Sequence, residues 1–241
     1  CEPLVRIYQI MVAGKPYKAW PGRQSPYSVE QEIYRFYDAG FRRFVVGNEF
    51  NLPGEWGQET PVTASQIWMA YNWLGEIYRQ VTARHPDIIL HLPAISPDAP
   101  RVAGEGYDVT QPSWAWPYDA LINLANDPAN PIPYDAVDFH AYWPKGQLQI
   151  GKDRALRALQ QASKPIYLSE AGSMPDRDEI AGAEMRDFLV WCEGQPRVLK
   201  VNFWVWDAFA GSGFEGHILK GSTAWGYLIP PPAPSTPPAP P

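Results

Sequence analysis

The stretch RFVVGNEFN, residues 43–51, decides the fold that we expect for this chain. Residues 44–46 are a short run of apolar β-formers, and a glycine follows them directly. A run of this length and composition predicts a buried strand. The strand delivers an amide and a carboxylate, Asn48 and Glu49, at its carboxyl end. In an α/β barrel that end of a strand is where chemistry takes place, so we expect a site here.

A second stretch, PIYLSEAG at residues 165–172, has the same design. It is another short apolar strand, and it presents Glu170 near its end. A purely structural strand end would favour a neutral residue at such a position. Two carboxylates at the ends of separate hydrophobic strands therefore suggest one shared site.

Predicted helices and strands alternate around these two stretches. Strands are expected at residues 4–12, 43–51, 136–144, 165–172 and 198–209, and residues 87–97 are expected to be a strand that runs into a loop. Helices are expected at about residues 28–40, 63–85, 118–125, 152–163 and 179–193. Two helices begin at capping-box patterns, Ser28 with Gln31 and Thr63 with Gln66. Alternation of this kind predicts an α/β fold, with a parallel, barrel-like sheet, right-handed crossovers and helices outside.

The composition is that of one large α/β domain followed by a proline-rich segment. The chain has 241 residues and a net charge of −6. The sequence has no basic patch of the kind that would suggest nucleic-acid binding. Its 11 Trp and 13 Tyr supply flat rings that pack in cores and also stack on sugar faces. We expect the domain over residues 1–229. From Pro230 to residue 241 we expect a linker or tail of polyproline II type that leads to a further module.

Cysteine and histidine usage indicates neither a disulfide framework nor a metal site. Cys192 falls in a predicted helix and is expected to be a buried free thiol. Cys1 is either an arbitrary chain start or the lipid-bearing residue of a processed lipoprotein, and we expect a secreted or cell-surface protein. The four His are scattered without ligand spacing, so neither a metal nor another cofactor is expected. No stretch reaches about 18 consecutive apolar residues, so no membrane span is predicted.

Several features, in their order along the chain, resemble the clan A glycoside hydrolases. Asn48 and Glu49 close one strand, Glu170 closes a later one, His-Ala-Tyr at residues 140–142 lies between them, and a Trp-rich strand follows. The resemblance covers about residues 4–228. It implies a retaining (β/α)8 enzyme in which Glu49, after strand 4 of the family, is the acid/base. Glu170, after strand 7, would then be the nucleophile.

The same resemblance implies a gap in the barrel. Six strand-helix units are predicted where the family has eight, and the strand at residues 4–12 would match strand 3 of the family. The units matching strands 1 and 2 are then absent. We therefore expect an incomplete TIM-barrel-like fold with sheet edges near residues 4–12 and 198–209, across which a homodimer could form. Phe50 stands where the family usually has proline, which leaves Glu49 unaffected.

The resemblance also assigns polar contacts to the substrate. Asn48 would hydrogen-bond the sugar 2-hydroxyl beside the reacting carbon, although a turn-favouring asparagine is the plainer explanation. His140 and Tyr142 alternate along one strand and so point the same way. The phenol would keep Glu170 ionised, and the imidazole would bind substrate or tune Glu49. A core histidine without such a role is the alternative.

Tryptophans would form the sugar-binding surface. The resemblance makes Trp204 the floor of the sugar site, and Trp206 and Trp143 could extend it. Trp206 shares a face with Trp204, but inward barrel packing explains it equally well. Asp138 is expected to face the same interior as His140, at a lower level.

The residues and the resemblance together predict a glycoside hydrolase that cleaves β-linked glycans or glycosides with retention, by double displacement. Its partner would be an oligo- or polysaccharide, bound without nucleic acid or cofactor. Two other functions stay open. A carbohydrate-binding pseudoenzyme would keep the tryptophan cleft and lose activity through the missing barrel wall. A structural module of a cell-surface assembly is suggested by the proline-rich tail.

Overall fold

A single parallel sheet forms the centre of the molecule. The computed structural model describes residues 4–7, 9–12, 15–18, 26–103, 110–174 and 179–203. The sheet has six strands in the order β1-β4-β5-β6-β7-β8, and each pairs in parallel with its neighbours. The strands are β1 (Leu4–Ile7), β4 (Arg43–Val46), β5 (Ile89–Leu92), β6 (Ala136–Pro144), β7 (Ile166–Met174) and β8 (Val198–Phe203).

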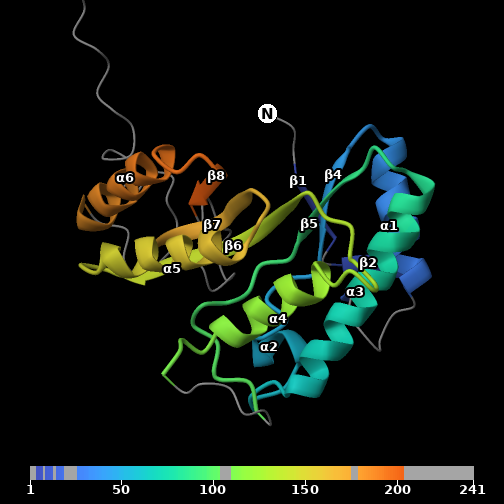
Figure 1. Ribbon diagram of the computed structural model, residues 1–241, viewed down its shortest axis with the longest axis horizontal. Coiled ribbons are helices and arrows are strands. Elements are labelled where there is room, and N and C mark those ends of the chain that lie inside the picture. Colours follow the sequence, from blue (N-terminus) through green and yellow to red (C-terminus); the bar gives the residue numbers. More distant parts are fainter. Residues whose placement is uncertain are drawn as a thin grey trace, which may run out of the picture.

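Helices follow the strands and lie along the outside of the curled sheet (Figure 1). They are α1 (Pro26–Asp38), the short α2 (Pro53–Trp56), α3 (Ala64–Arg84), α4 (Ala115–Ala125), α5 (Leu148–Gln161) and α6 (Glu179–Glu193). Six parallel strands make half of a barrel, with β1 and β8 at the two edges of the described sheet. The predicted incomplete α/β barrel is confirmed.

The predicted single strand at residues 4–12 is wrong beyond Ile7. β1 ends there, and β2 (Gln9–Val12) pairs instead with β3 (Lys15–Lys18) in a separate antiparallel sheet. Only Ala13 and Gly14 separate these two strands in the sequence, and a connection of two residues that includes glycine favours a hairpin.

One of the two predicted capping boxes is present in the structure. Thr63 caps α3: its side chain accepts from the Gln66 backbone N–H, and the Gln66 side chain accepts from the Thr63 N–H in return. The second box is wrong, because α1 begins at Pro26 and so contains Ser28 within its first turn. Proline at the first helical position has no N–H to leave unpaired, which favours this earlier start.

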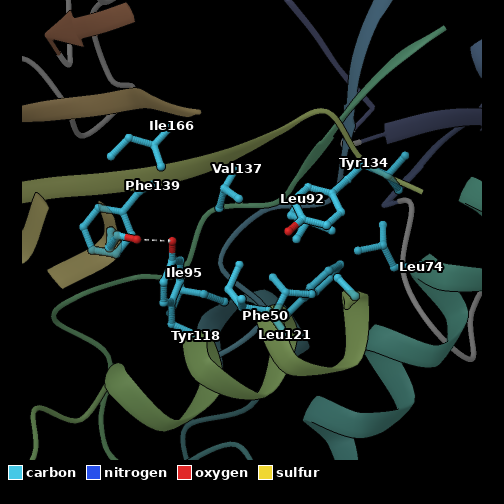
Figure 2. Packing of buried hydrophobic residues seen from close by; sticks show 14 of the residues in the cluster. Phe50, Leu74, Leu92, Ile95, Tyr118, Leu121, Tyr134, Val137, Phe139 and Ile166 are labelled. Atoms are coloured by element: carbon cyan, nitrogen blue, oxygen red, sulfur yellow. Dashed lines mark hydrogen bonds between the residues drawn. The ribbon is translucent and has the colours of Figure 1, made fainter. Parts of the chain in front are cut away.

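The main core lies between the sheet and its helices (Figure 2). Val137 and Phe139 of β6 point into it, and Phe139 packs edge-to-face on Tyr118 of α4 with ring centroids 5.5 Å apart. Because side chains alternate along a strand, the neighbours of Phe139 on either side point to the inside of the curl. Asp138 and His140 are such residues, and both are fully buried.

The remaining predictions about the chain concern residues outside this description. The last strand was expected to reach residue 209, and the structure describes it only as far as Phe203. The predicted domain end and the proline-rich segment also lie outside the described residues. Within the described part of the chain, no helix is long and apolar enough to cross a membrane.

Candidate active site

Glu49 lies just beyond the carboxyl end of β4 in an uncommon backbone conformation. Its φ is 39°, and it is the sole non-glycine residue with positive φ among those that the structure describes. The Glu49 N–H donates to the Ala94 carbonyl at 3.0 Å, and the Glu49 carbonyl accepts from the Leu52 N–H at 2.8 Å. Such conformations cost free energy and collect at functional sites, where the surroundings enforce them.

Gly47 makes this turn possible. Its φ is 80°, a conformation that glycine adopts without strain. A Cβ atom on Gly47 would also collide with the ring of Phe50, which is fully buried. The sequence Gly-Asn-Glu-Phe therefore packs one aromatic ring under the turn and turns the Glu49 carboxylate towards the inside of the sheet.

Glu170 faces the same interior because of a β-bulge in β7. Phe139 pairs with Leu168, but His140 pairs with Glu170, so Ser169 is an extra residue in the ladder. Strict alternation would put Glu170 on the helix side together with Leu168. The bulge turns the Glu170 side chain to the inside of the curl instead, an effect that bulges have beside many active sites.

His140 lies between the two carboxylates. Its Nδ1 is 2.8 Å from Glu49 Oε1, which is hydrogen-bond distance. Its Nε2 is 3.4 Å from Glu170 Oε1, close enough for an ion pair although it meets no hydrogen-bond geometry. One fully buried imidazole thus spans the space between Glu49 and Glu170. The structure thus brings together three residues that are far apart in the sequence. His140 follows Glu49 by 91 positions, and Glu170 follows His140 by 30.

Two further donors hold the Glu170 carboxylate. The Tyr142 hydroxyl donates to Oε2 at 2.6 Å, so this residue stands where the sequence predicted it. Arg6 of β1 donates to Oε1 at 2.6 Å and, through its other guanidinium nitrogen, to Ser169 Oγ at 3.2 Å. Sequence reasoning missed Arg6. The available signal was a charged side chain in the middle of the apolar run Leu4–Ile7.

These contacts fix the charge of Glu170. Burial alone would raise the pKa of this carboxyl. The charges of His140 and Arg6, with hydrogen bonds from Tyr142 and Arg6, outweigh burial and hold the pKa of Glu170 below its ordinary value. The group is therefore ionised at neutral pH and fixed on both oxygens.

The Asn48 side chain lies beside the Glu49 carboxylate. Its Nδ2 is 3.5 Å from Glu49 Oε2, at the limit of a hydrogen bond. Its side-chain oxygen is buried and has no hydrogen-bond partner among the described residues. A buried polar atom without a hydrogen-bond partner suggests that a ligand completes the site.

A second polar layer lies deeper in the curl. Asp138 Oδ1 is 2.7 Å from His91 Nδ1, and both side chains are fully buried. An Arg43 nitrogen is 3.1 Å from His91 Nε2. Because arginine can only donate, Nε2 is the acceptor and the ring proton lies on Nδ1, towards Asp138. Asp138 is thus in the interior and below His140, as expected, while His91 and Arg43 were not anticipated.

The tryptophans expected in the site do not take part in the described geometry. Trp143 is 1% exposed, packs on Phe188 with ring centroids 4.8 Å apart, and donates to Glu184 at 3.2 Å. The expectation that Trp143 extends a sugar-binding surface is wrong, because the Trp143 side chain lies on the helix side of β6, opposite to that of Tyr142. Trp204 and Trp206 lie outside the described residues.

Comparisons with known proteins give a likeness of fold without a likeness of sequence. No family model matches the sequence, and no curated protein matches it either. The fold resembles that of glycoside hydrolase family 128, GH128. An endo-β-1,3-glucanase of this family from Sorangium cellulosum superimposes with a TM-score of 0.58 at 16% identity, over 95% of this chain and 81% of that one.

Two other GH128 structures are similar. An endo-β-1,3-glucanase from Amycolatopsis mediterranei, in complex with laminaritriose, has a TM-score of 0.57 at 14% identity, over 94% of this chain and 81% of that one. An oligosaccharide-binding protein from Trichoderma gamsii has a TM-score of 0.52 at 12% identity, over 94% and 77%. At this identity the likeness shows the fold alone.

Proposed function

We propose that this protein is a retaining glycoside hydrolase that cleaves β-linked glucans, and that β-1,3-glucan is its substrate. The observation that carries the proposal is the pair Glu49 and Glu170, held at the ends of two parallel strands on either side of one imidazole. Retaining hydrolysis needs two carboxyl groups about 5 to 5.5 Å apart, one ionised and one able to give a proton. The GH128 enzymes that share the fold supply the linkage.

Glu170 is the nucleophile. It is ionised, buried and aligned by Tyr142 and Arg6. In the first step a Glu170 oxygen attacks the anomeric carbon and the glycosidic C–O bond breaks. Its electron pair goes to the leaving oxygen, which takes the proton of Glu49. The product is a covalent glycosyl-enzyme.

In the second step Glu49 takes a proton from water. The water oxygen bonds to the anomeric carbon, and the bond to Glu170 breaks with its electron pair returning to the carboxylate. One water is consumed for each bond cleaved. His140 can hydrogen-bond both protonation states of Glu49. Nδ1 of the neutral ring accepts a hydrogen bond from the carboxylic acid, whereas Nδ1 of the protonated ring donates one to the carboxylate.

Substrate contacts follow the same assignment. Asn48, next to the acid/base, would bind the 2-hydroxyl of the reacting sugar, an interaction that strengthens in the transition state. Trp204 and Trp206 remain the candidate sugar-stacking residues. Secretion, a further module after the proline-rich tail and a homodimer across the open edge also remain proposals.

Hydrolysis of laminarihexaose tests the function. The wild-type chain is expected to release shorter β-1,3-glucans, and Glu170→Ala is expected to be slower by about 10⁴-fold. Azide should restore part of the Glu170→Ala activity by attacking from the vacated side. Glu193→Ala, an exposed carboxylate at the end of α6, is the matched control and should remain active. Cleavage that survives in Glu170→Ala without azide would contradict the proposal.

A carbohydrate-binding protein without catalysis is the second candidate. It is favoured by the half-barrel and by the Trichoderma gamsii oligosaccharide-binding protein, which shares the fold. The two candidates differ in one observation. Laminarihexaose bound by the wild-type chain and recovered uncleaved after long incubation would support binding alone.

A further inference from the structure

A surface pocket lies between α3 and α4, away from Glu49 and Glu170. Its volume is about 330 Å³, near the lower end of the roughly 300–1,000 Å³ typical of small-ligand sites. The two helices lie side by side in Figure 1. The residues that line the pocket and carry the argument are Trp68 of α3, Gln111 before α4, and Trp116, Asp119 and Asn123 of α4.

Two tryptophans form a corner of this pocket. The rings of Trp68 and Trp116 lie with centroids 6.1 Å apart at an angle of 86°. Trp68 is 38% exposed, which is a large apolar area to leave in water. The small side chains of Ala115 and Ala120 also line the pocket. The arrangement offers one indole as a floor and the other as a wall.

Polar side chains surround this corner. Gln111 and Asn123 are exposed, and neither side-chain amide has a hydrogen-bond partner within the described ranges. Asp119 accepts from Arg157 at 2.9 Å through Oδ2, while Oδ1 is buried and unpaired within the same described ranges. Amide and carboxylate groups of this kind complement hydroxyl groups, which both donate and accept.

The charge balance separates two classes of ligand. Aromatic corners with a carboxylate also bind quaternary ammonium groups by cation–π attraction. Here the Asp119 carboxylate is already paired with Arg157, so the pocket offers no uncompensated negative charge. A neutral ligand with one flat apolar face and several hydroxyl groups fits better.

We infer that the Trp68–Trp116 pocket is a second carbohydrate-binding site, which holds one or two sugar units of a glucan chain outside the catalytic site. Trp116 is the second residue of α4, and Trp68 lies in the second turn of α3. In a parallel strand-helix fold these helix ends lie on the side where the strands end. A polymer held in the pocket is therefore kept near the catalytic face.

The inference rests on the proposed function for the identity of the glucan, and its test is separate from catalysis. Binding of the full chain to insoluble β-1,3-glucan is measured by sedimentation, in a Glu170→Ala background that prevents digestion. Trp68→Ala and Asn123→Ala are expected to weaken binding by about threefold to tenfold, the effect of losing one stacked ring or a few hydrogen bonds. Met69→Ala is the control, because Met69 is exposed on the same helix and does not line the pocket.

With Glu170 intact, Trp68→Ala should hydrolyse laminaritriose at the wild-type rate, because neither Glu49 nor Glu170 lines the pocket. Polymer binding by Trp68→Ala and Asn123→Ala equal to that of Met69→Ala would overturn the inference, and so would Trp68-dependent binding of choline in place of sugar. Trp68-dependent binding to glucan in a wild-type chain that cleaves none would support the pocket and contradict the proposed hydrolase.

Discussion

Glu170 lies directly opposite His140 in the ladder between β6 and β7, one residue out of step with the strand before it. Ser169 takes up the extra position, and its hydroxyl accepts from the same Arg6 guanidinium that binds Glu170. The bulge thus turns two consecutive side chains of β7 to the inside of the curl. The approach of Glu170 to His140 depends on this single irregularity.

Removal of the bridging imidazole should affect both carboxylates. We expect His140→Ala to lower kcat by about 10²- to 10³-fold, because Glu49 loses its hydrogen bond and Glu170 loses a neighbouring charge. The acid limb of the pH–rate profile should also move to higher pH, since that charge lowers the pKa of Glu170. His85→Ala, at the end of α3, is the control and should keep both rate and profile. An unchanged kcat in a folded His140→Ala variant would show that the imidazole takes no part in the mechanism.

Arg6 should set the pH range of the proposed hydrolysis. Its charge and hydrogen bond help to hold the pKa of Glu170 below the ordinary value, so Arg6→Met should raise that pKa. Because the proposed nucleophile Glu170 must be ionised to react, the acid limb of kcat/KM should move to higher pH in this variant. Arg35→Met, which loses an exposed pair with Glu32, should leave the limb in place.

The same pKa shift has a consequence for stability. A carboxylate whose pKa is lowered on folding stabilises the native state above its unfolded-state pKa, and this contribution is lost as the pH falls through the folded-state pKa. Arg6→Met should therefore be less stable than the wild type near pH 7. The difference due to Glu170 should shrink in acid. Urea unfolding at several pH values measures it, and a difference that grows in acid would contradict the assignment.

The turn that carries Glu49 should not tolerate a side chain at Gly47. Gly40→Ala is the matched variant: its φ is 98°, but a Cβ there meets open space, so we expect a cost of about 1–2 kcal/mol from the backbone alone. Gly47→Ala should cost about 2–5 kcal/mol, because the Phe50 ring must also move. Activity should fall in Gly47→Ala only. Equal unfolding free energies for the two variants would show that Phe50 does not constrain the turn.

Trp143 should matter for stability and not for substrate binding. Trp143→Phe loses buried volume and a hydrogen bond to Glu184, so we expect a loss of about 1–2 kcal/mol. KM should stay unchanged, because the ring lies under α5 and α6, where it contacts Gly151 and Phe188. A raised KM at unchanged stability would return Trp143 to the sugar-binding surface.

Local patterns in the sequence were sufficient for the fold class and for the two carboxylates. Apolar runs that end in Asn48-Glu49 and in Glu170 are visible within a few residues, and strand-helix alternation predicts the parallel sheet. The Thr63 capping box likewise depends on neighbours three residues apart, and it is present. The opposite facing of Trp143 and Tyr142 was also readable, because they are adjacent on one strand.

Other parts of the site depend on contacts that no local pattern records. Arg6 meets Glu170 across 164 residues of sequence, and only the pairing of β1 with the rest of the sheet brings them together. The bulge at Ser169 changes the facing of Glu170 without a glycine or proline to mark it. The hairpin of β2 and β3 was missed because an apolar run hid the break after Ile7.

Product stereochemistry tests the central claim most directly, that Glu49 and Glu170 act as a retaining pair. Proton NMR of laminarihexaose hydrolysis, recorded before the sugars mutarotate, distinguishes the two anomers of each new reducing end. A covalent intermediate on Glu170 inverts the anomeric carbon twice, so the account predicts that the β-anomer appears first. The α-anomer appearing first would mean a single displacement by water, and it would contradict the assignment of Glu170 as nucleophile.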